Sequence, residues 1–465
     1  MAFVNSSKMF AITMAIQEGG GRAKPRGVDE MAAASSATVS VGGEVFQALG
    51  AAIESRWRDQ NYDEQAFPNI AAEQLAEAEL NDRVTAWEAV RWVHSLPQLP
   101  IQHDVEGRFG NPPITLYSGR RFHIDIYFWV NGTTDIHQHG FHGAFQVLLG
   151  SSIHSRYGFQ QEHAISERFL IGQVIFKDSE LLKVGDIRKI IAGKEFIHSL
   201  FHLDRPSATI TVRSHEAVTA QPQYSYLRPH VAYDPFFKQV SAVKILQSVS
   251  LLMTVDHADA EAMIGELLAS LDFHTTFSVL QTVYFLGSNE LEKAWGVTRA
   301  KERFHRLLEK ARHRHGRLVD VIPPIVEEQK RVGDLVQRRS FITTKEHRFL
   351  LALLLNVPSR TKILELVSQY FPKQDPAETV LEWVEELSTT KVWGSSEPNV
   401  LGIKDFDNDH LFVLQKLLEG ISLEQSCTGL RKQYRSKRTP SLERKLEAIA
   451  QSLRGSTVFK FLLAD

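Results

Sequence analysis

The chain has 465 residues, which suggests about two to four domains at the usual size of roughly 100 to 200 residues each. Apolar residues make up 43% and charged residues 23% of the sequence, a balance that excludes collagen-like, coiled-coil and wholly disordered chains. Lys and Arg number 53 against 55 Asp and Glu, so no overall charge draws the chain to nucleic acid or to anionic membranes.

The sequence carries no evident targeting signal. The apolar stretch near the N-terminus is interrupted by Lys8 and Gln17 and has no basic region before it, so we expect no signal peptide. No apolar run approaches the roughly 20 residues that a membrane-spanning helix needs. The single cysteine, Cys427, cannot form an intrachain disulfide or a cysteine-ligated metal cluster. We therefore expect a cytoplasmic protein that binds neither membrane nor nucleic acid.

The first third of the chain predicts a leader followed by helices. Residues 1–43 are rich in Gly, Ala and Ser and show no sustained period, which predicts a flexible leader. Within residues 44–112, apolar residues recur three or four positions apart, as from Phe46 to Trp57. This spacing predicts an N-terminal helical segment with one buried face.

The period then changes to two, which indicates strands. In RRFHIDIYFWV, Phe122, Ile124 and Ile126 alternate with other residues, and AFQVLLG, RFLIGQVIF, IRKII and SATITVR follow between Gly, Asn, Asp and Ser. No helical pattern separates these runs, so a barrel or a double-sheet jelly roll is favoured over a parallel βαβ sheet. We predict a β domain over residues 113–220.

Residues 235–465 return to a period of three to four, which predicts a large all-α C-terminal domain. The pairs Asp234-Pro235 and Asp375-Pro376 have the residue types of an N-cap and a first helical position, and we predict a helix start at each. The expected fold is thus α+β and multidomain, with a central jelly-roll barrel between an N-terminal helical segment and the all-α domain.

The strongest chemical signal is a set of histidines in the β domain. His137 and His139 lie two residues apart, and alternate residues of a strand point to one face, so both rings could reach one ion. His198, after the turn residues Ala192 and Gly193, could complete a facial set of three nitrogens with positions left for substrate and dioxygen. The alternative is chance, because the chain has 19 histidines and a lone His is more often a core or surface residue.

The two histidine segments resemble the two motifs of the cupin superfamily, in which HxH and a later His bind a metal inside a small jelly roll. The run FHIDIYFWVNGTTDIHQHGFHGAFQVLLG is most similar to the cysteine dioxygenase family. This resemblance covers about Tyr117 to Arg213. It implies that His137, His139 and His198 bind ferrous iron, with another divalent metal as the alternative.

Several positions depart from the pattern of these families. Many cupins have a Glu four or five residues after HxH; Gly143 and Ala144 stand there, which implies a three-His site with Gln146 or His142 as an outer ligand. The Ser, His and Tyr of the cysteine dioxygenase family, spaced two apart after the third ligand, are replaced. The aligned residues are Thr209, Thr211 and Arg213. The resemblance therefore does not imply thiol dioxygenation itself, and we assign no catalytic acid or base.

Three residues, Tyr117, Arg120 and Arg213, are candidates for substrate binding. The resemblance implies a carboxylate-binding Arg early in the domain, and Arg120 or Arg121, just after Tyr117, matches it approximately. Arg213 could clamp a carboxylate or phosphate through two hydrogen bonds, or could point outward in a salt bridge.

Two functions are consistent with these features. The first is a non-haem iron oxygenase or dioxygenase that oxidises a small anionic metabolite, such as an amino acid or thiol derivative, because three neutral ligands leave the iron a net positive charge. The second is a non-catalytic cupin that binds a metal or ligand as a sensor or protein-interaction module. The helical domain could cover the barrel mouth, present substrate or form a homodimer.

Overall fold

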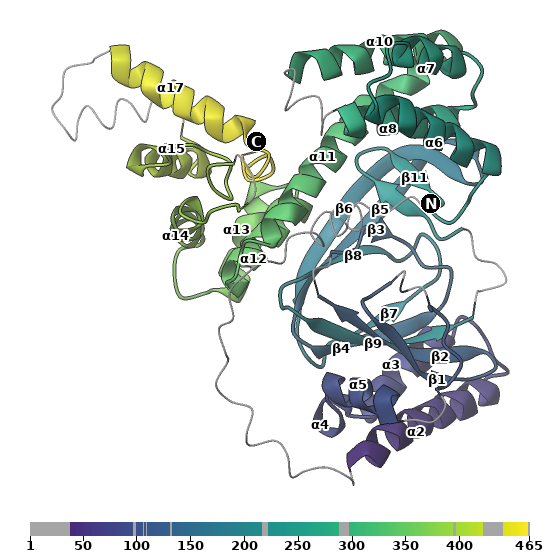
Figure 1. The fold of residues 1–465 in the computed structure, drawn as a ribbon. Coiled ribbons are helices and arrows are strands. Elements are labelled where there is room, and N and C mark those ends of the chain that lie inside the picture. The colour runs from purple at the N-terminus through teal and green to yellow at the C-terminus, as the bar shows by residue number, and fades with distance from the viewer. Residues whose placement is uncertain are drawn as a thin grey trace.

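The structure is a computed structural model that describes residues 38–95, 99–105, 107, 109–130, 133–215, 222–287, 297–393, 397–421 and 440–463. The first helix begins at Thr38, inside the predicted leader, and the side chains of residues 38–42, 297–299 and 440–443 are not described. The rest of the leader and Cys427 lie outside the described residues. Figure 1 shows the central strands between an N-terminal group of helices and the C-terminal helices.

Helices occupy the N-terminal segment, as its period predicts. They are α2 (Thr38–Asp59), α3 (Phe67–Glu77), α4 (Leu80–Arg83) and α5 (Ala86–Ser95). Their apolar side chains share one core with the outer face of the first β sheet. In that core the rings of Trp57 and Phe67 lie 4.2 Å apart, and the ring of Phe122 lies 5.7 Å from that of Phe67. The helices therefore cover one face of the sheet.

The first sheet has five strands in the order β1-β2-β9-β4-β7. The strands are β1 (Pro113–Ser118), β2 (Phe122–Trp129), β4 (Gly143–Leu149), β7 (Ile187–Ile190) and β9 (Ser207–Ser214). Ile124 and Ile126 of β2 belong to the core under the N-terminal helices. His123, Asp125 and Tyr127 alternate with them and point to the opposite face, toward the second sheet. The face of the first sheet that is turned toward the second sheet therefore carries polar side chains.

The second sheet is a closed antiparallel barrel in the order β10-β11-β6-β5-β8-β3. Its strands are β3 (Ile136–His137), β5 (Ser152–Ser166), β6 (Phe169–Leu182), β8 (Ile197–His202), β10 (Ser225–Leu227) and β11 (Val231–Tyr233). The barrel prediction is confirmed at this level. The strands continue past the predicted boundary at residue 220. The sequence did not reveal β10 and β11, because each has three residues and is too short to show a period.

The C-terminal half is helical. Its helices are α6 (Val240–Thr254), α7 (Ala260–Leu268), α8 (Phe273–Leu286), α10 (Val297–His315), the 3-10 helix η2 (Gly316–Val321), α11 (Ile322–Arg339), α12 (Lys345–Asn356), α13 (Arg360–Tyr370), α14 (Pro376–Ser388), α15 (Asn408–Leu418) and α17 (Pro440–Gly455). They form two apolar cores. Ile325 of α11 lies in one with Phe169 of the barrel, and Leu335 of α11 lies in the other with Phe201. Helix α11 thus links both cores to the barrel.

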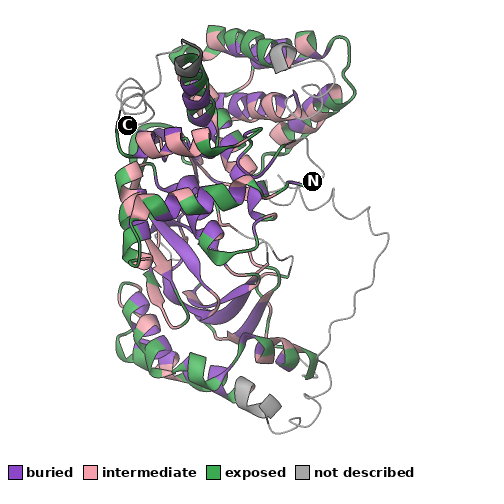
Figure 2. Cartoon of the chain, turned by 90° about the vertical axis from the view of Figure 1, so that its left-hand side faces the viewer, coloured by how far each residue is buried: buried purple, intermediate pink, exposed green. Residues whose placement is uncertain are grey.

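Burial follows the arrangement of these layers. Figure 2 shows most of the central strands as buried, while exposed residues lie along the outer sides of the surrounding helices. None of the described helices combines the length and the apolar character that a membrane crossing requires.

One of the two predicted helix starts is confirmed. Asp375 caps α14, and its carboxylate accepts hydrogen bonds from the backbone N–H groups of residues 377 and 378. The prediction at Asp234 is wrong, because α6 begins at Val240. The Asp234 carboxylate instead forms an ion pair with Arg168 and accepts a hydrogen bond from the backbone of Phe236 at 2.9 Å. Asp234 thus holds a turn at Phe236 and an ion pair with Arg168 before β6, and the chain enters a helix only at Val240.

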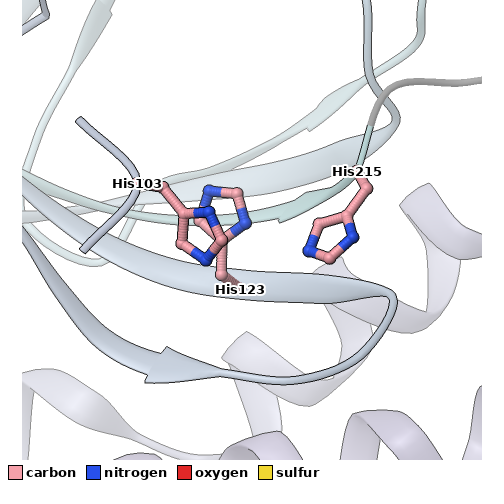
Figure 3. Close-up of side chains that lie close together, drawn as sticks. All are labelled: His103, His123 and His215. Carbon is pink, nitrogen blue, oxygen red and sulfur yellow. The ribbon is translucent and has the colours of Figure 1, made fainter. Parts of the chain in front are cut away.

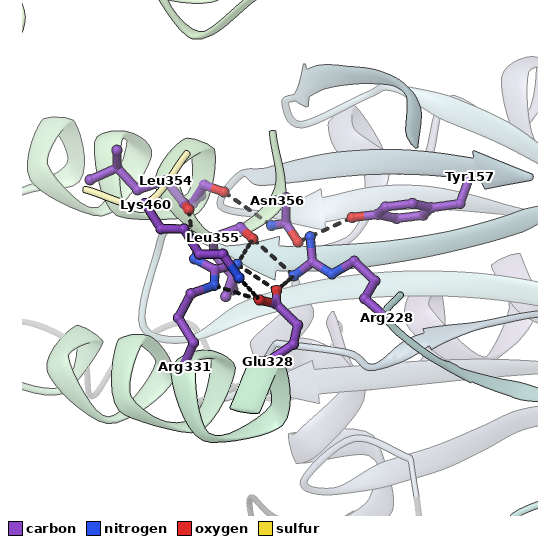
Figure 4. A network of polar contacts seen from close by, with 9 residues as sticks. Tyr157, Arg228, Glu328, Arg331, Leu354, Leu355, Asn356 and Lys460 are labelled. Carbon is purple, nitrogen blue, oxygen red and sulfur yellow. Dashed lines mark hydrogen bonds and ion pairs between the residues drawn. The ribbon is translucent and has the colours of Figure 1, made fainter. Parts of the chain in front are cut away.

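A buried ionic network joins the barrel to α11 (Figure 4). Arg331 donates to both carboxylate oxygens of Glu328, at 2.9 and 2.8 Å, and Arg228, which follows β10, lies 3.3 Å from the same carboxylate. Lys460 donates to it at 3.1 Å. Arg331 and Arg228 also donate to the backbone oxygen of Leu355 at the end of α12, at 3.0 and 2.9 Å. One carboxylate thus contacts three cations from three parts of the chain.

A second anchor lies at the end of α11. Arg339, which is 2% exposed, donates through Nε and one terminal nitrogen to the backbone oxygen of His202, at 3.0 and 2.5 Å. Its guanidinium also faces the ring of Phe201, 5.6 Å from the centroid. Both contacts are made to β8, so α11 holds this strand directly.

Candidate metal centre

The structure brings the three predicted metal ligands together. His137 of β3 is the strand partner of His198 of β8, and His139 follows two residues after His137. One ligand atom from each of the three rings lies within 4.8 Å of the other two. His139 is beyond the end of the short strand β3, so the turn, rather than strand alternation alone, positions its ring.

The spacing of the nitrogens suits one ion. His139 Nε2 and His198 Nε2 are 2.9 Å apart. Two nitrogens bound at right angles to one ion, with bonds of about 2.1 Å, lie about 3.0 Å from each other. His198 is 3% exposed, so an ion at this position would be held inside the barrel. The arrangement matches the facial set of three nitrogens expected from the sequence.

The second nitrogen of each ring has its own environment. His137 Nδ1 lies 2.7 Å from the backbone oxygen of Asp135, which fixes the proton on Nδ1 and leaves the Nε2 lone pair free. His198 Nδ1 lies 3.1 Å from His154 Nε2. His139 Nδ1 is buried and has no hydrogen-bond partner among the described residues. Two of the three rings are thus oriented by outer contacts.

His154, Glu180 and Arg188 continue this outer contact. His154 Nδ1 lies 3.0 Å from Glu180 Oε1, and Arg188 donates to the two oxygens of Glu180 at 2.8 and 2.5 Å. The hydrogen bonds of Arg188, then that of His154, lower the pKa of Glu180 to about 2, so the carboxylate only accepts. Burial lowers the pKa of His154, which keeps this ring neutral. His154 therefore donates to Glu180 and accepts from His198 Nδ1, and the lone pair of His198 Nε2 faces the other ligands.

Sequence reasoning did not identify His154 and Glu180. The two residues are strand partners on β5 and β6, and His154 also pairs with Leu200 of β8. A single sequence does not reveal this register, because a slip of one residue would turn each side chain to the other face.

Burial keeps the three ligand histidines neutral. It lowers the pKa of His137, and it lowers the pKa of His139 and His198 well below the ordinary value, with further lowering from the neighbouring histidines. The charge of Arg213 lowers the pKa of His139 as well. Neutral imidazoles are the form that binds a metal, so the rings are ready to coordinate at neutral pH.

Arg213 points into the interior beside this group. It is the strand partner of His123 and donates to the hydroxyl of Tyr127 at 3.3 Å. Its guanidinium carbon lies 4.0 Å from the ring centroid of Phe141, and that ring lies 4.7 Å from the ring of His139. Arg213 Nε is buried without a partner, and no ion pair with Arg213 is seen among the described residues. The described contacts therefore do not support the outward salt bridge.

The other two predicted substrate contacts lie elsewhere. Tyr117 points to the helix side of the sheet, where a β carbon at Gly50 of α2 would collide with its ring. Arg120 is exposed in the turn between β1 and β2, and the neighbouring Arg121 covers the ring of Tyr62. Neither Tyr117 nor Arg120 is brought to the three histidines, because Tyr117 faces the N-terminal helices and Arg120 is exposed in the turn.

The two residues considered as outer ligands are also separate from the three-His group. Gln146 lies between Ala144 and Leu148 on β4, and these two belong to the core under the N-terminal helices. Strand alternation therefore turns Gln146 away from the interior. The Nδ1 atom of His142 accepts a hydrogen bond from the backbone of Ala192 at 3.3 Å.

A further buried histidine, His202, lies on β8 and faces the interior. Its Nδ1 lies 2.9 Å from the hydroxyl of Ser152 and 2.7 Å from that of Ser207, and its ring stacks on Trp129 at 4.8 Å. Burial, with the charge of Arg339, lowers the pKa of His202 to about 3, so the ring is neutral. Its Nε2 has no partner among the described residues, which leaves one polar atom free inside the barrel.

Comparisons with known proteins add no family. No protein-family model matches the sequence, and no curated protein shows significant similarity to it. The closed antiparallel barrel and the three-His group are compatible with a cupin-like β domain.

Proposed function

We propose that this protein is a cupin-type non-haem iron oxygenase that oxidises a small anionic metabolite, such as an amino acid or thiol derivative. The convergence of His137, His139 and His198 on one point carries the proposal. Ferrous iron held by three neutral imidazoles would keep a net positive charge and open positions, and could bind an anionic substrate and activate dioxygen.

The outer residues have a positioning role in this proposal. His154, held by the ionised Glu180, keeps the proton of His198 on Nδ1. The Nε2 lone pair then points to the metal position without a change of tautomer. Outer partners of this kind raise the basicity of a metal-bound His and fix its ring.

Arg213 supports the choice of an anionic substrate. It has a buried Nε without a partner, and it contacts the same Phe141 ring as His139. A guanidinium binds a carboxylate through two parallel hydrogen bonds. A small molecule could thus place its acidic group at Arg213 and a donor atom at the metal position.

The test measures metal content and oxygen uptake together. The full-length protein is loaded with ferrous iron under anaerobic conditions, mixed with a metabolite extract, and exposed to air while an oxygen electrode and mass spectrometry follow the reaction. We expect oxygen uptake and a new oxidised product. His137→Ala should lose one iron equivalent and the activity, whereas His163→Ala, an exposed His on β5, should keep both.

The competing function is the non-catalytic sensor or protein-interaction module. A folded wild-type protein that binds metal at the three histidines but consumes no oxygen with any metabolite fraction would favour that function. If wild type and His137→Ala contained the same amount of iron, the three histidines would not be the metal site in either function.

A further inference from the structure

A second group of three histidines lies at the end of the first sheet, apart from the metal centre described above. His103 lies in the segment 99–105, His123 is near the start of β2, and His215 directly follows β9. One ligand atom from each ring lies within 4.8 Å of the other two. In Figure 3 the ring of His103 overlies that of His123, and the ring of His215 lies beside them.

Strand register places two of these rings together. His123 pairs with Arg213, so His215, two residues later, points to the same face of the sheet. The backbone N–H of His215 donates to the oxygen of Arg121 at 2.9 Å, which continues the pairing of β9 with the start of β2. His215 is therefore held beside His123 by the sheet itself.

Hydrogen bonds to β1 position the third ring. Gln102 donates to the backbone oxygen of Thr115 at 3.0 Å and accepts from the backbone N–H of Thr115 at 2.9 Å. The backbone N–H of His103 donates to the hydroxyl of Thr115 at 3.3 Å. These three bonds fix the segment over the edge of the sheet, with His103 above His123.

His123 lacks the partners that a buried ring needs. Its side chain is 4% exposed, yet neither ring nitrogen has a hydrogen-bond partner among the described residues. Asp125 Oδ2, which also accepts a hydrogen bond from Tyr127, lies 3.3 Å from His123 Nε2 and faces that side of the ring. His123 Nδ1 is left without a partner among the described residues. A buried polar group normally has a partner, so a missing ligand at His123 is indicated.

We propose that His103, His123 and His215 bind a second divalent transition metal ion, such as zinc, at this end of the sheet. Imidazole nitrogens suit zinc, copper, nickel and iron. The carboxylate of Asp125 beside His123 and the hydroxyl of Ser118, 3.1 Å from His103 Nε2, are the outer partners that commonly orient metal-bound histidines. Both partners contact Nε2, so the Nδ1 atoms of His123 and His103 remain available for the ion.

The state of the rings is consistent with metal binding. Burial is the first cause that lowers the pKa of all three, and the charge of Arg213 contributes, so the lone pairs are available at neutral pH. The rings of His103 and His123 are stacked, 3.9 Å apart with an angle of 13° between their planes. One ring must turn for both to reach one ion. His103 and His215 are exposed, which allows this movement while His123 stays fixed.

The ion would connect three parts of the chain. It would tie the segment 99–105 to β2 and to the end of β9, close to Arg213, which pairs with His123 and contacts the same Phe141 ring as His139. We therefore assign this second site a structural role at the end of the first sheet, beside the Arg213 side chain proposed to bind substrate.

The experiment counts cobalt ions per chain. The full-length protein, first freed of metal, is titrated with Co(II) and followed by absorption and by metal analysis after gel filtration. The variants are the double variant His103→Ala/His215→Ala, His137→Ala, their combination, and His163→Ala as the control. Circular dichroism checks the fold of each, and the two exposed positions should tolerate alanine.

We expect wild type and the His163→Ala control to bind one ion more than the double variant. The double variant should also lose part of the rise in melting temperature that metal gives to wild type. His137→Ala should keep the second ion, so failure of the first metal centre would not hide the second. An equal number of ions and an equal rise in melting temperature in wild type and the double variant would overturn this proposal and leave the first centre unaffected.

Discussion

Replacement of Glu180 by Gln tests the outer contact of the metal centre with almost no change of shape. Glu180 accepts from His154 and from two nitrogens of Arg188. Gln has one oxygen and one NH₂ group in the same places. If its oxygen stays with His154, its NH₂ group faces a donor of Arg188. If the amide turns over, the NH₂ group faces His154, which must then accept on Nδ1 and carry its proton on Nε2.

The proton shift would reach the metal position. A proton on His154 Nε2 faces His198 Nδ1 at 3.1 Å, so His198 must accept there and carry its own proton on Nε2, the atom proposed to bind the ion. Loss of an outer partner typically weakens metal binding by about 10- to 100-fold, which corresponds to about 1.4 to 2.8 kcal/mol. We expect Glu180→Gln to fall in this range.

The assay is anaerobic competition for Co(II) or Fe(II) between the protein and a coloured chelator. Glu162→Gln is the matched control, because Glu162 lies on the same β5–β6 hairpin but is exposed and accepts a hydrogen bond from Gln173 at 2.9 Å, away from His154. A dissociation constant for Glu180→Gln within twofold of wild type would refute the proposed role of the His154–Glu180 pair.

Three further predictions concern the substrate position, the ionic network and the N-terminal core. Arg213→Gln should keep the bound metal and raise KM about 10- to 100-fold, as expected for loss of a charged hydrogen bond; metal loss with unchanged KM would contradict this. The cations around Glu328 outweigh its burial and lower its pKa to about 2. Because this pKa is lowered, ionised Glu328 adds about 3 kcal/mol to the free energy of unfolding above pH 4.5, and this contribution is lost as the pH falls toward 2. Urea unfolding of Glu328→Gln should lack this pH dependence. Phe67→Ala should reduce the free energy of unfolding by about 3 to 5 kcal/mol, and a change under 1 kcal/mol would show that this core is not tightly packed.

The sequence predicted the features that depend on local pattern. Alternation in the run that became β2 identified strands, the period of three to four identified the helices, and the spacing of His137 and His139 with a later His198 identified the metal ligands. Apart from His198, which is 59 residues after His139, each of these signals lies within a few residues of chain.

Features that depend on pairing between distant segments were missed. Asp234 looked like a helix cap, but its carboxylate pairs with Arg168, 66 residues earlier. His154 and Glu180 meet only because of the β5–β6 register. Tyr117 follows a shift in the pairing of β1 with β2, so its side chain could not be assigned to a face from the sequence. Short strands such as β10 carry too few residues to show a period.

The anchor between Arg339 and β8 has a consequence for how the protein could be divided. Arg339 binds the backbone of the strand that carries His198, and Phe201 of that strand lies in the same apolar core as Leu335 of α11. Removal of the C-terminal half would uncover Phe201 and free the end of β8. Helix α11 thus supports the strand that carries His198. Truncation of the chain, or a binding partner that displaces α11, would therefore change the affinity of the three histidines for metal.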